Sequence, residues 1–276
     1  MSNVSIPIQI KRSLLIETPF LTPAEIDALR RELTYENPEY ERRLKAGNPL
    51  GDLKPTFSTI SGNVGSYEIA RGAMRKVEKV LGKDRCRWVV RANKVPVSWP
   101  SYKGQLRPYQ ERAAKVALAS IQGIVVGGCG SGKTEILLGA AHRAGQRTLI
   151  VVDSVDLQRQ WRDRYVQRFD TDGSDVTLIG GDGPSSGPLG DVITIATAQS
   201  IRNRQDALDA VGTIIADEVH LWAARTFQDV VARCPAFYRL GATATLQRTD
   251  GLVPRIVDTF GDVVYTVSDE ELSNAC

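Results

Sequence analysis

A glycine-rich run ending in a lysine and a threonine is the strongest chemical signal in the 276-residue sequence. Residues 127–134 read GGCGSGKT and match the pattern GxxxxGK[ST]. Glycines allow backbone N–H groups to surround phosphate oxygens, the lysine ammonium supplies charge, and the threonine hydroxyl can bind Mg²⁺. The run therefore predicts a nucleotide-phosphate site formed by Gly128, Gly130, Ser131, Gly132, Lys133 and Thr134.

A pair of acidic residues follows another short apolar run, in the segment TIIADEVH at residues 213–220. A phosphate site of this kind needs a carboxylate at the end of a second strand to hold the magnesium shell, a role that suits Asp217. Glu218 would then orient and activate the attacking water. A lone histidine is more often structural, and only the DEVH context gives His220 a place in the site.

The elements that must position these motifs alternate along the chain. Short β-branched runs at 123–127, 148–153, 176–180, 192–197, 213–217 and 237–243 are separated by helix-like segments at 134–145, 157–169 and 200–212. Continuous apolar strands between helices predict a parallel sheet covered on both faces. We therefore predict an α/β protein in which a parallel-sheet P-loop domain over residues 101–276 follows a small mixed α/β domain over residues 1–100.

The first hundred residues carry their own signals. Thr22 with Glu25 predicts a capped helix over 22–33, and Asn37 with Pro38 predicts a second helix over 37–46. Helix and strand patterns follow at 70–82 and 86–92, and a proline-rich linker is expected at 95–104.

Positive charge is concentrated between Arg71 and Arg107. Eleven Lys or Arg residues less two acidic ones give this stretch +9, in a chain whose formal net charge is +3. Such a stretch suits a phosphate backbone, which makes Arg71 and Arg75 candidate nucleic-acid contacts; a solvated helix face with a protected strand edge explains the charge equally well. Trp88 is expected in the core, whereas Trp99 is left open between core packing and base stacking.

The bulk composition narrows the class of protein. No apolar run reaches the roughly 18 residues of a membrane span, and the first residues lack the pattern of a signal peptide. Four widely spaced cysteines argue against a zinc site or a disulfide framework. We expect a protein that does not enter a membrane and works in the cytoplasm of a bacterial or phage-infected cell.

In combination, these motifs resemble the first RecA-like domain of superfamily 2 DEAD/DEAH-type helicases, closest to the branch of repair and phage recombination helicases. The matching segments span about residues 103–266. They are LRPYQ at 106–110 (adenine segment), the P-loop (motif I), LIVVD at 149–153 with Leu157 and Trp161 (Ia), IATAQS at 195–200 (Ib), DEVH at 217–220 (II), GATAT at 241–245 (III) and the trailing Arg248 and Asp250.

The resemblance implies ATP and Mg²⁺ as cofactors and DNA as partner, whether duplex, forked or single-stranded. Arg107 and Gln110 would then recognise adenine, and Thr243, Thr245 and Arg248 would couple the nucleotide site to DNA, with His220 bridging motifs II and III. Implied strand contacts are Ser154, Gln158, Thr197 and Gln199. Helix caps and turn polar groups are an equally good reading of any one of these four.

Two departures from the family pattern matter. Leu246 stands where the family usually has proline after motif III. The family's second RecA-like domain, with arginines that complete the ATP site, has no counterpart in the sequence, so we expect ATP binding with slow hydrolysis unless that domain is supplied in cis or in trans.

The predicted function is therefore that of the ATP-binding half of a DNA helicase or translocase in repair or recombination. Two alternatives stay open. One is the duplex-translocating motor of a restriction or defence complex, and the other is a non-hydrolysing ATP- or DNA-binding regulatory module. An RNA helicase is less favoured, because the aromatic-plus-Gln arrangement of DEAD-box RNA enzymes is missing.

Overall fold

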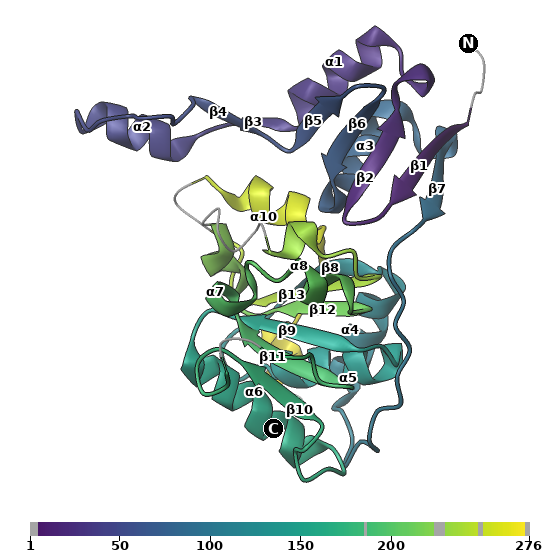
Figure 1. The fold of residues 1–276 in the computed structure, drawn as a ribbon, viewed down its shortest axis with the longest axis vertical. Coiled ribbons are helices and arrows are strands. Elements are labelled where there is room, and N and C mark those ends of the chain that lie inside the picture. The colour runs from purple at the N-terminus through teal and green to yellow at the C-terminus, as the bar shows by residue number, and fades with distance from the viewer. Residues whose placement is uncertain (1–4, 185–186, 224–229, 248–250, 274–276) are drawn as a thin grey trace.

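The computed structural model describes residues 5–184, 187–223, 230–247 and 251–273. A small sheet with two helices lies at the N-terminal end, a larger parallel sheet sandwiched by helices makes up most of the rest, and a thin arm projects from the small domain (Figure 1).

The N-terminal elements are β1 (Ile6–Ile10), β2 (Ser13–Glu17), η1 (Thr18–Phe20), α1 (Pro23–Glu32), β3 (Thr34–Glu36), α2 (Pro38–Lys45), β4 (Thr56–Ser58), β5 (Ile60–Asn63), β6 (Ser66–Ala70), η2 (Arg71–Ala73), α3 (Met74–Leu81), η3 (Lys83–Arg85) and β7 (Cys86–Val90). The larger domain contains α4 (Pro108–Ala119), β8 (Gln122–Val126), α5 (Lys133–Ala144), β9 (Thr148–Val152), α6 (Val155–Arg168), β10 (Val176–Ile179), β11 (Ile193–Thr197), α7 (Ala198–Ile201), α8 (Gln205–Asp209), β12 (Thr213–Ala216), η4 (Val219–Ala223), β13 (Tyr238–Thr243), α10 (Val253–Phe260), β14 (Val263–Thr266) and α11 (Asp269–Ser273).

The larger sheet has the strand order β10-β11-β9-β12-β13-β8-β14, and all its pairings are parallel. Side chains alternate between its faces: Ile150 packs in the core beneath α4, α5 and α6, whereas Leu149 and Val151 pack beneath α7, α8 and α10. Burial on both faces explains why these strands read as continuous apolar runs. The predicted α/β fold with a parallel P-loop sheet is confirmed.

Most predicted elements of this domain are present within a residue or two. The expected helix over 200–212 is instead two short helices, α7 and α8, with Arg202 at the end of the first and Arg204 at the start of the second. The sequence did not predict β14 or α10, which close the sheet beside β8 and cover its second face.

The N-terminal sheet has the order β5-β6-β2-β1-β7 and is antiparallel except where β7 pairs with β1. Its buried face packs on α1 and α3, with Ile8, Leu14, Leu29 and Val77 in the core. The capping box predicted for α1 is present, because Glu25 N donates to Thr22 Oγ1 at 3.3 Å and Thr22 N donates to Glu25 Oε2 at 2.8 Å.

The arm consists of β3, α2 and β4 and extends away from the N-terminal sheet above α10 (Figure 1). α2 has no buried residue, and its acidic and basic side chains pair along the helix, as in the contact of Arg43 with Glu39. At the base of the arm, the Arg255 guanidinium lies 4.6 Å from the Phe57 ring centroid, which fixes that end of the arm to α10.

The predicted linker packs along the P-loop domain. Val97 N donates to Gly145 O at 3.0 Å, and Trp99 Nε1 donates to Gln146 O at 3.0 Å. The Trp99 ring contacts Tyr165 edge-on and Phe169 at a tilt and packs against the hydrophobic core, which favours core packing over base stacking. On these contacts we propose that the second domain begins near Arg91, some ten residues before the boundary expected from the sequence.

α10 is the main docking surface for the N-terminal domain. Asp258 on α10 is fully buried and accepts hydrogen bonds from Tyr35 Oη (2.7 Å), Thr59 Oγ1 (2.6 Å) and Lys76 Nζ (2.6 Å). Gly72 in η2 lies so close to this helix that a Cβ there would sit 2.3 Å from Val257 O. The two domains therefore share a tightly packed, charged interface.

No helix in the described ranges is both long and apolar enough to cross a membrane. The cytoplasmic location expected from the sequence stays a prediction.

Candidate nucleotide and nucleic-acid site

The motifs predicted from the sequence meet at one edge of the parallel sheet. The P-loop follows β8, motif III ends β13, and DEVH follows β12, and these three strands are neighbours in the order β12-β13-β8. Because all three run in the same direction, their carboxyl ends lie side by side, which is where sheets of this type bind ligands.

The P-loop has the geometry of a phosphate cradle. Gly130 (φ +76°) and Gly132 (φ +72°) are in the left-handed region that favours glycine, and the space where a Cβ of Gly128 or Gly130 would sit is open. Lys133 Nζ donates to Gly127 O at 2.8 Å and to Gly128 O at 3.3 Å, so its ammonium lies over the loop. These residues, at the N-terminus of α5, fit the phosphates of a nucleotide.

Ser131 supports the same fit from inside the loop. It is fully buried, yet its hydroxyl finds no hydrogen-bond partner among the described residues. Its carbonyl accepts from the Tyr109 hydroxyl at 2.9 Å, which ties the loop to α4. A buried hydroxyl in this position is available to a ligand oxygen.

The segment before α4 lies against the P-loop. Gln110 is nearly buried, and its Oε1 accepts from Arg107 N at 2.9 Å, while its Nε2 faces the backbone of Gly132. Arg107 is exposed at the N-cap of α4. The side-chain oxygen of Gln110 is therefore already hydrogen-bonded to the first turn of α4. Recognition of adenine by Arg107 and Gln110 stays a prediction.

Asp217 is held from two sides. Trp161 Nε1 donates to its Oδ2 at 2.7 Å, and Glu218 N donates to its Oδ1 at 2.9 Å. Burial raises the pKa of the Asp217 carboxyl, against the lowering effect of these hydrogen bonds and of the Lys133 charge. The carboxylate and the half-exposed Thr134 hydroxyl are the two oxygen donors that Mg²⁺ would use here, with water completing its shell.

His220 lies between Glu218 and motif III and is hydrogen-bonded to motif III. His220 Nδ1 lies 3.1 Å from Glu218 Oε2 and 2.8 Å from Thr243 Oγ1, whose hydroxyl donates to Thr245 O at 2.7 Å. Because Thr243 gives its single proton to Thr245, it must accept from His220, so we assign the histidine proton to Nδ1. The expected contact between His220 and motif III is present.

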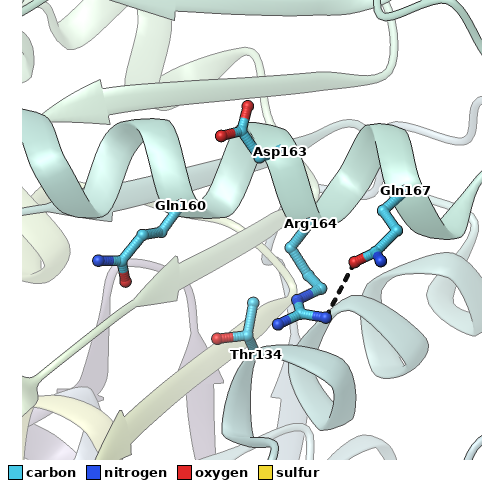
Figure 2. A pocket seen from close by; sticks show the side chains of 5 residues that line it. All are labelled: Thr134, Gln160, Asp163, Arg164 and Gln167. Carbon is cyan, nitrogen blue, oxygen red and sulfur yellow. Dashed lines mark hydrogen bonds between the residues drawn. The ribbon is translucent and has the colours of Figure 1, made fainter.

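A pocket beside Thr134 opens toward α6. Gln160 and Arg164 extend from that helix toward Thr134, and Arg164 donates to Gln167 Oε1 at 3.0 Å (Figure 2). Arg164 also pairs with Glu135, the residue after Thr134, at 3.2 Å. α6 therefore forms a wall of the pocket beside Thr134, one of the two residues predicted to bind the metal.

Comparison with known proteins agrees with this arrangement. The family model described as the type III restriction enzyme res subunit matches residues 103–248, just over half of the chain. This chain belongs to that family. Its larger domain is a first RecA-like domain of the superfamily 2 type.

Relatives similar in sequence carry helicase or translocase names. The chain is 37% identical over 180 residues to the DNA 3'-5' helicase XPB of Mycobacterium tuberculosis, covering 62% of this chain and 32% of that protein. It is 35% identical over 175 residues to the DNA 3'-5' translocase XPB2 of Sulfurisphaera tokodaii, covering 62% and 38%. The chain thus spans about a third of the length of these curated relatives.

The crystal structure of the UvsW helicase from bacteriophage T4 shares the fold over both domains. Its TM-score is 0.71 at 15% identity, and the match covers 95% of this chain and all of that one. The N-terminal domain and the RecA-like domain therefore occur together in a second protein.

Two of the predicted nucleic-acid contacts, one in each domain, are wrong. Gln158 is fully buried, and its amide is used by Ile195 O at 2.9 Å, Ile179 O at 3.3 Å and Asp182 N at 3.3 Å. Arg71 is 1% exposed in the domain interface, where it donates to Ala236 O at 2.5 Å. Burial lowers its pKa to about 9, and no face of it is left for DNA.

The remaining predicted nucleic-acid contacts differ in how far their side chains are exposed to a ligand. Ser154 caps α6 by accepting from Leu157 N at 3.3 Å, and Thr197 is nearly buried with its hydroxyl 2.8 Å from Ser200 Oγ. Gln199 is exposed at the start of α7, and Arg75 is exposed although it pairs with Asp262 at 3.0 Å. Arg248 and Asp250 lie outside the described residues.

Sequence reasoning did not anticipate three contacts in and around the site. They are Trp161 on Asp217, Tyr109 on Ser131 and the Asp258 network under the N-terminal domain. Trp161 and Tyr109 stand inside motifs that the sequence identifies, but the sequence does not show which groups they contact.

Proposed function

We propose that this chain is the ATP-binding part of a DNA-dependent motor of the superfamily 2 helicase or translocase type. The observation that carries the proposal is the meeting of Lys133, Asp217–Glu218 and Thr243 at one sheet edge, with His220 hydrogen-bonded to Thr243 and 3.1 Å from Glu218. The names of its relatives as DNA helicases and translocases support DNA as the polymer.

The residues divide the work as follows. The P-loop amides, Ser131 and Lys133 would bind the β- and γ-phosphates, and Mg²⁺ would supply charge neutralisation there when bound through Thr134 and Asp217. Glu218 would hold the attacking water and take its proton. His220 and Thr243 would transmit a change in the position of the Glu218 side chain to the loop after β13.

DNA would lie along the other half of the same edge. β9 is next to β12, and β11 follows β9 in the sheet, so the loops after these two strands, which carry Ser154 and Gln199, lie along the same edge as the nucleotide site. Such contacts would reach phosphates and carry no base information.

Full turnover is proposed to need a second RecA-like domain, in cis or in trans. The described nucleotide site is open toward solvent at Gly128, Cys129 and Gly130, and arginines supplied across such a cleft raise rates by about 10³-fold or more in related NTPases.

The test is magnesium-dependent ATP hydrolysis with and without forked DNA, beside Lys133→Ala. Nucleotide binding that the variant loses, with turnover that rises on adding a second RecA-like domain, supports the proposal. Rapid DNA-stimulated hydrolysis by this chain alone would sink the requirement for a second domain, and absence of nucleotide binding would sink the function.

The family match also supports one alternative function, that of a motor that moves along duplex DNA without separating its strands. Displacement of a triplex-forming strand without unwinding of a fork would favour that reading. A regulatory module would bind ATP yet stay inactive with the second domain present.

A further inference from the structure

Trp161 lies in the core beneath the predicted metal site, with its polar edge turned toward that site. Its side chain is 1% exposed, and its Nε1 is 2.7 Å from Asp217 Oδ2. The other carboxylate oxygen accepts from Glu218 N at 2.9 Å. Each oxygen of Asp217 thus accepts from a fixed donor, and donors on different oxygens set the rotation of the carboxylate plane.

The two indoles that pack against this hydrophobic cluster use different acceptors. Trp99 packs against the same hydrophobic cluster and donates to a main-chain carbonyl, Gln146 O, at 3.0 Å. Trp161 donates instead to a carboxylate at the carboxyl edge of the sheet. A carbonyl acceptor would satisfy the indole equally well, so packing alone does not explain this hydrogen bond.

We propose that Trp161 is a positioning residue whose indole N–H holds Asp217 in the orientation that takes up Mg²⁺. The inference rests on the proposed function and adds a residue that touches neither nucleotide nor metal. Groups that orient a metal-binding carboxylate in this way typically contribute 10–100-fold to metal affinity. Trp161 therefore acts through Asp217, and its replacement should raise the Mg²⁺ concentration needed for half-saturation.

The experiment is a Mg²⁺ titration of the whole chain at a fixed concentration of a fluorescent ATP analogue. Trp161→Phe removes the donor and keeps an aromatic ring, and we expect its Mg²⁺ half-saturation to rise about tenfold. Binding of the analogue in EDTA should stay unchanged. Trp99→Phe is the matched control, since it also loses a core indole hydrogen bond but should keep the wild-type Mg²⁺ half-saturation.

A second arm separates positioning from general damage. In an Asp217→Asn background, Trp161→Phe should have no further effect on the Mg²⁺ response, because its route to the metal is gone. If Trp161→Phe does not fold, benzothienylalanine at position 161 keeps the shape of the indole and lacks the N–H.

The outcomes are distinct. An unchanged Mg²⁺ half-saturation in a folded Trp161 variant, or an equal shift in Trp99→Phe, overturns the inference while the proposed function stands. Failure of the wild-type chain to bind the analogue overturns both.

Discussion

Replacing Lys76 with methionine tests whether the domain interface depends on the buried charge of Asp258. Asp258 is fully buried on α10, and Lys76 on α3 reaches it at 2.6 Å with 24% of its side chain exposed. The Lys76→Met variant keeps most of the aliphatic stem and removes the cation. It leaves the carboxylate buried with two hydroxyl donors, from Tyr35 and Thr59.

The magnitude follows from that geometry. Breaking a buried ion pair from one side costs about 3–5 kcal/mol, because the remaining charge is uncompensated. The two hydroxyl donors and the partial exposure of Lys76 reduce this, so we expect a loss of about 2–3 kcal/mol in the free energy of unfolding. Urea unfolding followed by circular dichroism measures it.

The same helix provides the control. Lys79 pairs with Glu32 at 2.9 Å but is 69% exposed, so Lys79→Met should cost only about 0.2–1 kcal/mol. Adding Asp258→Asn to Lys76→Met removes the stranded charge and should recover part of the loss. Equal effects of Lys76→Met and Lys79→Met, or no recovery in the double variant, would refute the reasoning.

Three further predictions concern the nucleotide site and the N-terminal domain. Thr243→Val removes the hydroxyl between His220 and Thr245 O. With a second RecA-like domain present, we expect the stimulation of ATP hydrolysis by DNA to fall about 5–150-fold and the nucleotide affinity to stay unchanged. A loss of nucleotide affinity instead would contradict this prediction. Gly132→Ala should weaken binding of a fluorescent ATP analogue more than Gly130→Ala does. Both positions have a positive φ, but a Cβ at 132 would lie 2.2 Å from Gln110 Nε2 and displace that amide, whereas a Cβ at 130 meets nothing. Equal loss in both variants would assign the effect to backbone strain. Burial raises the pKa of Glu25, but the Thr22 N–H and Arg85 outweigh it and the net pKa is lowered from 4.5. The carboxylate therefore contributes stability above pH 4.5 that is lost as the pH falls through the lowered pKa. Unfolding of Glu25→Gln should depend less on pH in this acid range, and an unchanged slope would be the contrary result.

The sheet edge that gathers the site could be predicted from sequence, and the reason is geometric. Apolar runs before the P-loop and before Asp217 must be buried strands, and helices between them force the strands to be parallel. Parallel strands present their carboxyl ends together, so Lys133 and Asp217 had to share an edge.

The fate of the basic stretch could not be predicted in the same way. Arg71 and Arg75 are four residues apart, yet one is buried against the carbonyls of Ala236 and Phe237 and the other is exposed. The carbonyls that receive Arg71 lie more than 160 residues away in the sequence. A count of charges identifies the cations but not their acceptors. It therefore left Arg71 between a DNA contact and a solvated face and could not predict that this residue is buried in the domain interface.

The strained backbone of Glu218 is a second feature that could not be predicted from the sequence. It has φ +47°, a conformation that non-glycine residues avoid and that costs about 1–3 kcal/mol. In that conformation its N–H donates to Asp217 Oδ1, and its carbonyl accepts from Leu221 N at 2.8 Å. The strain is therefore tied to the orientation of Asp217, which Trp161 holds from the other side. A glycine at 218 would relieve the backbone but remove the carboxylate, so the chemistry keeps the strained residue in place.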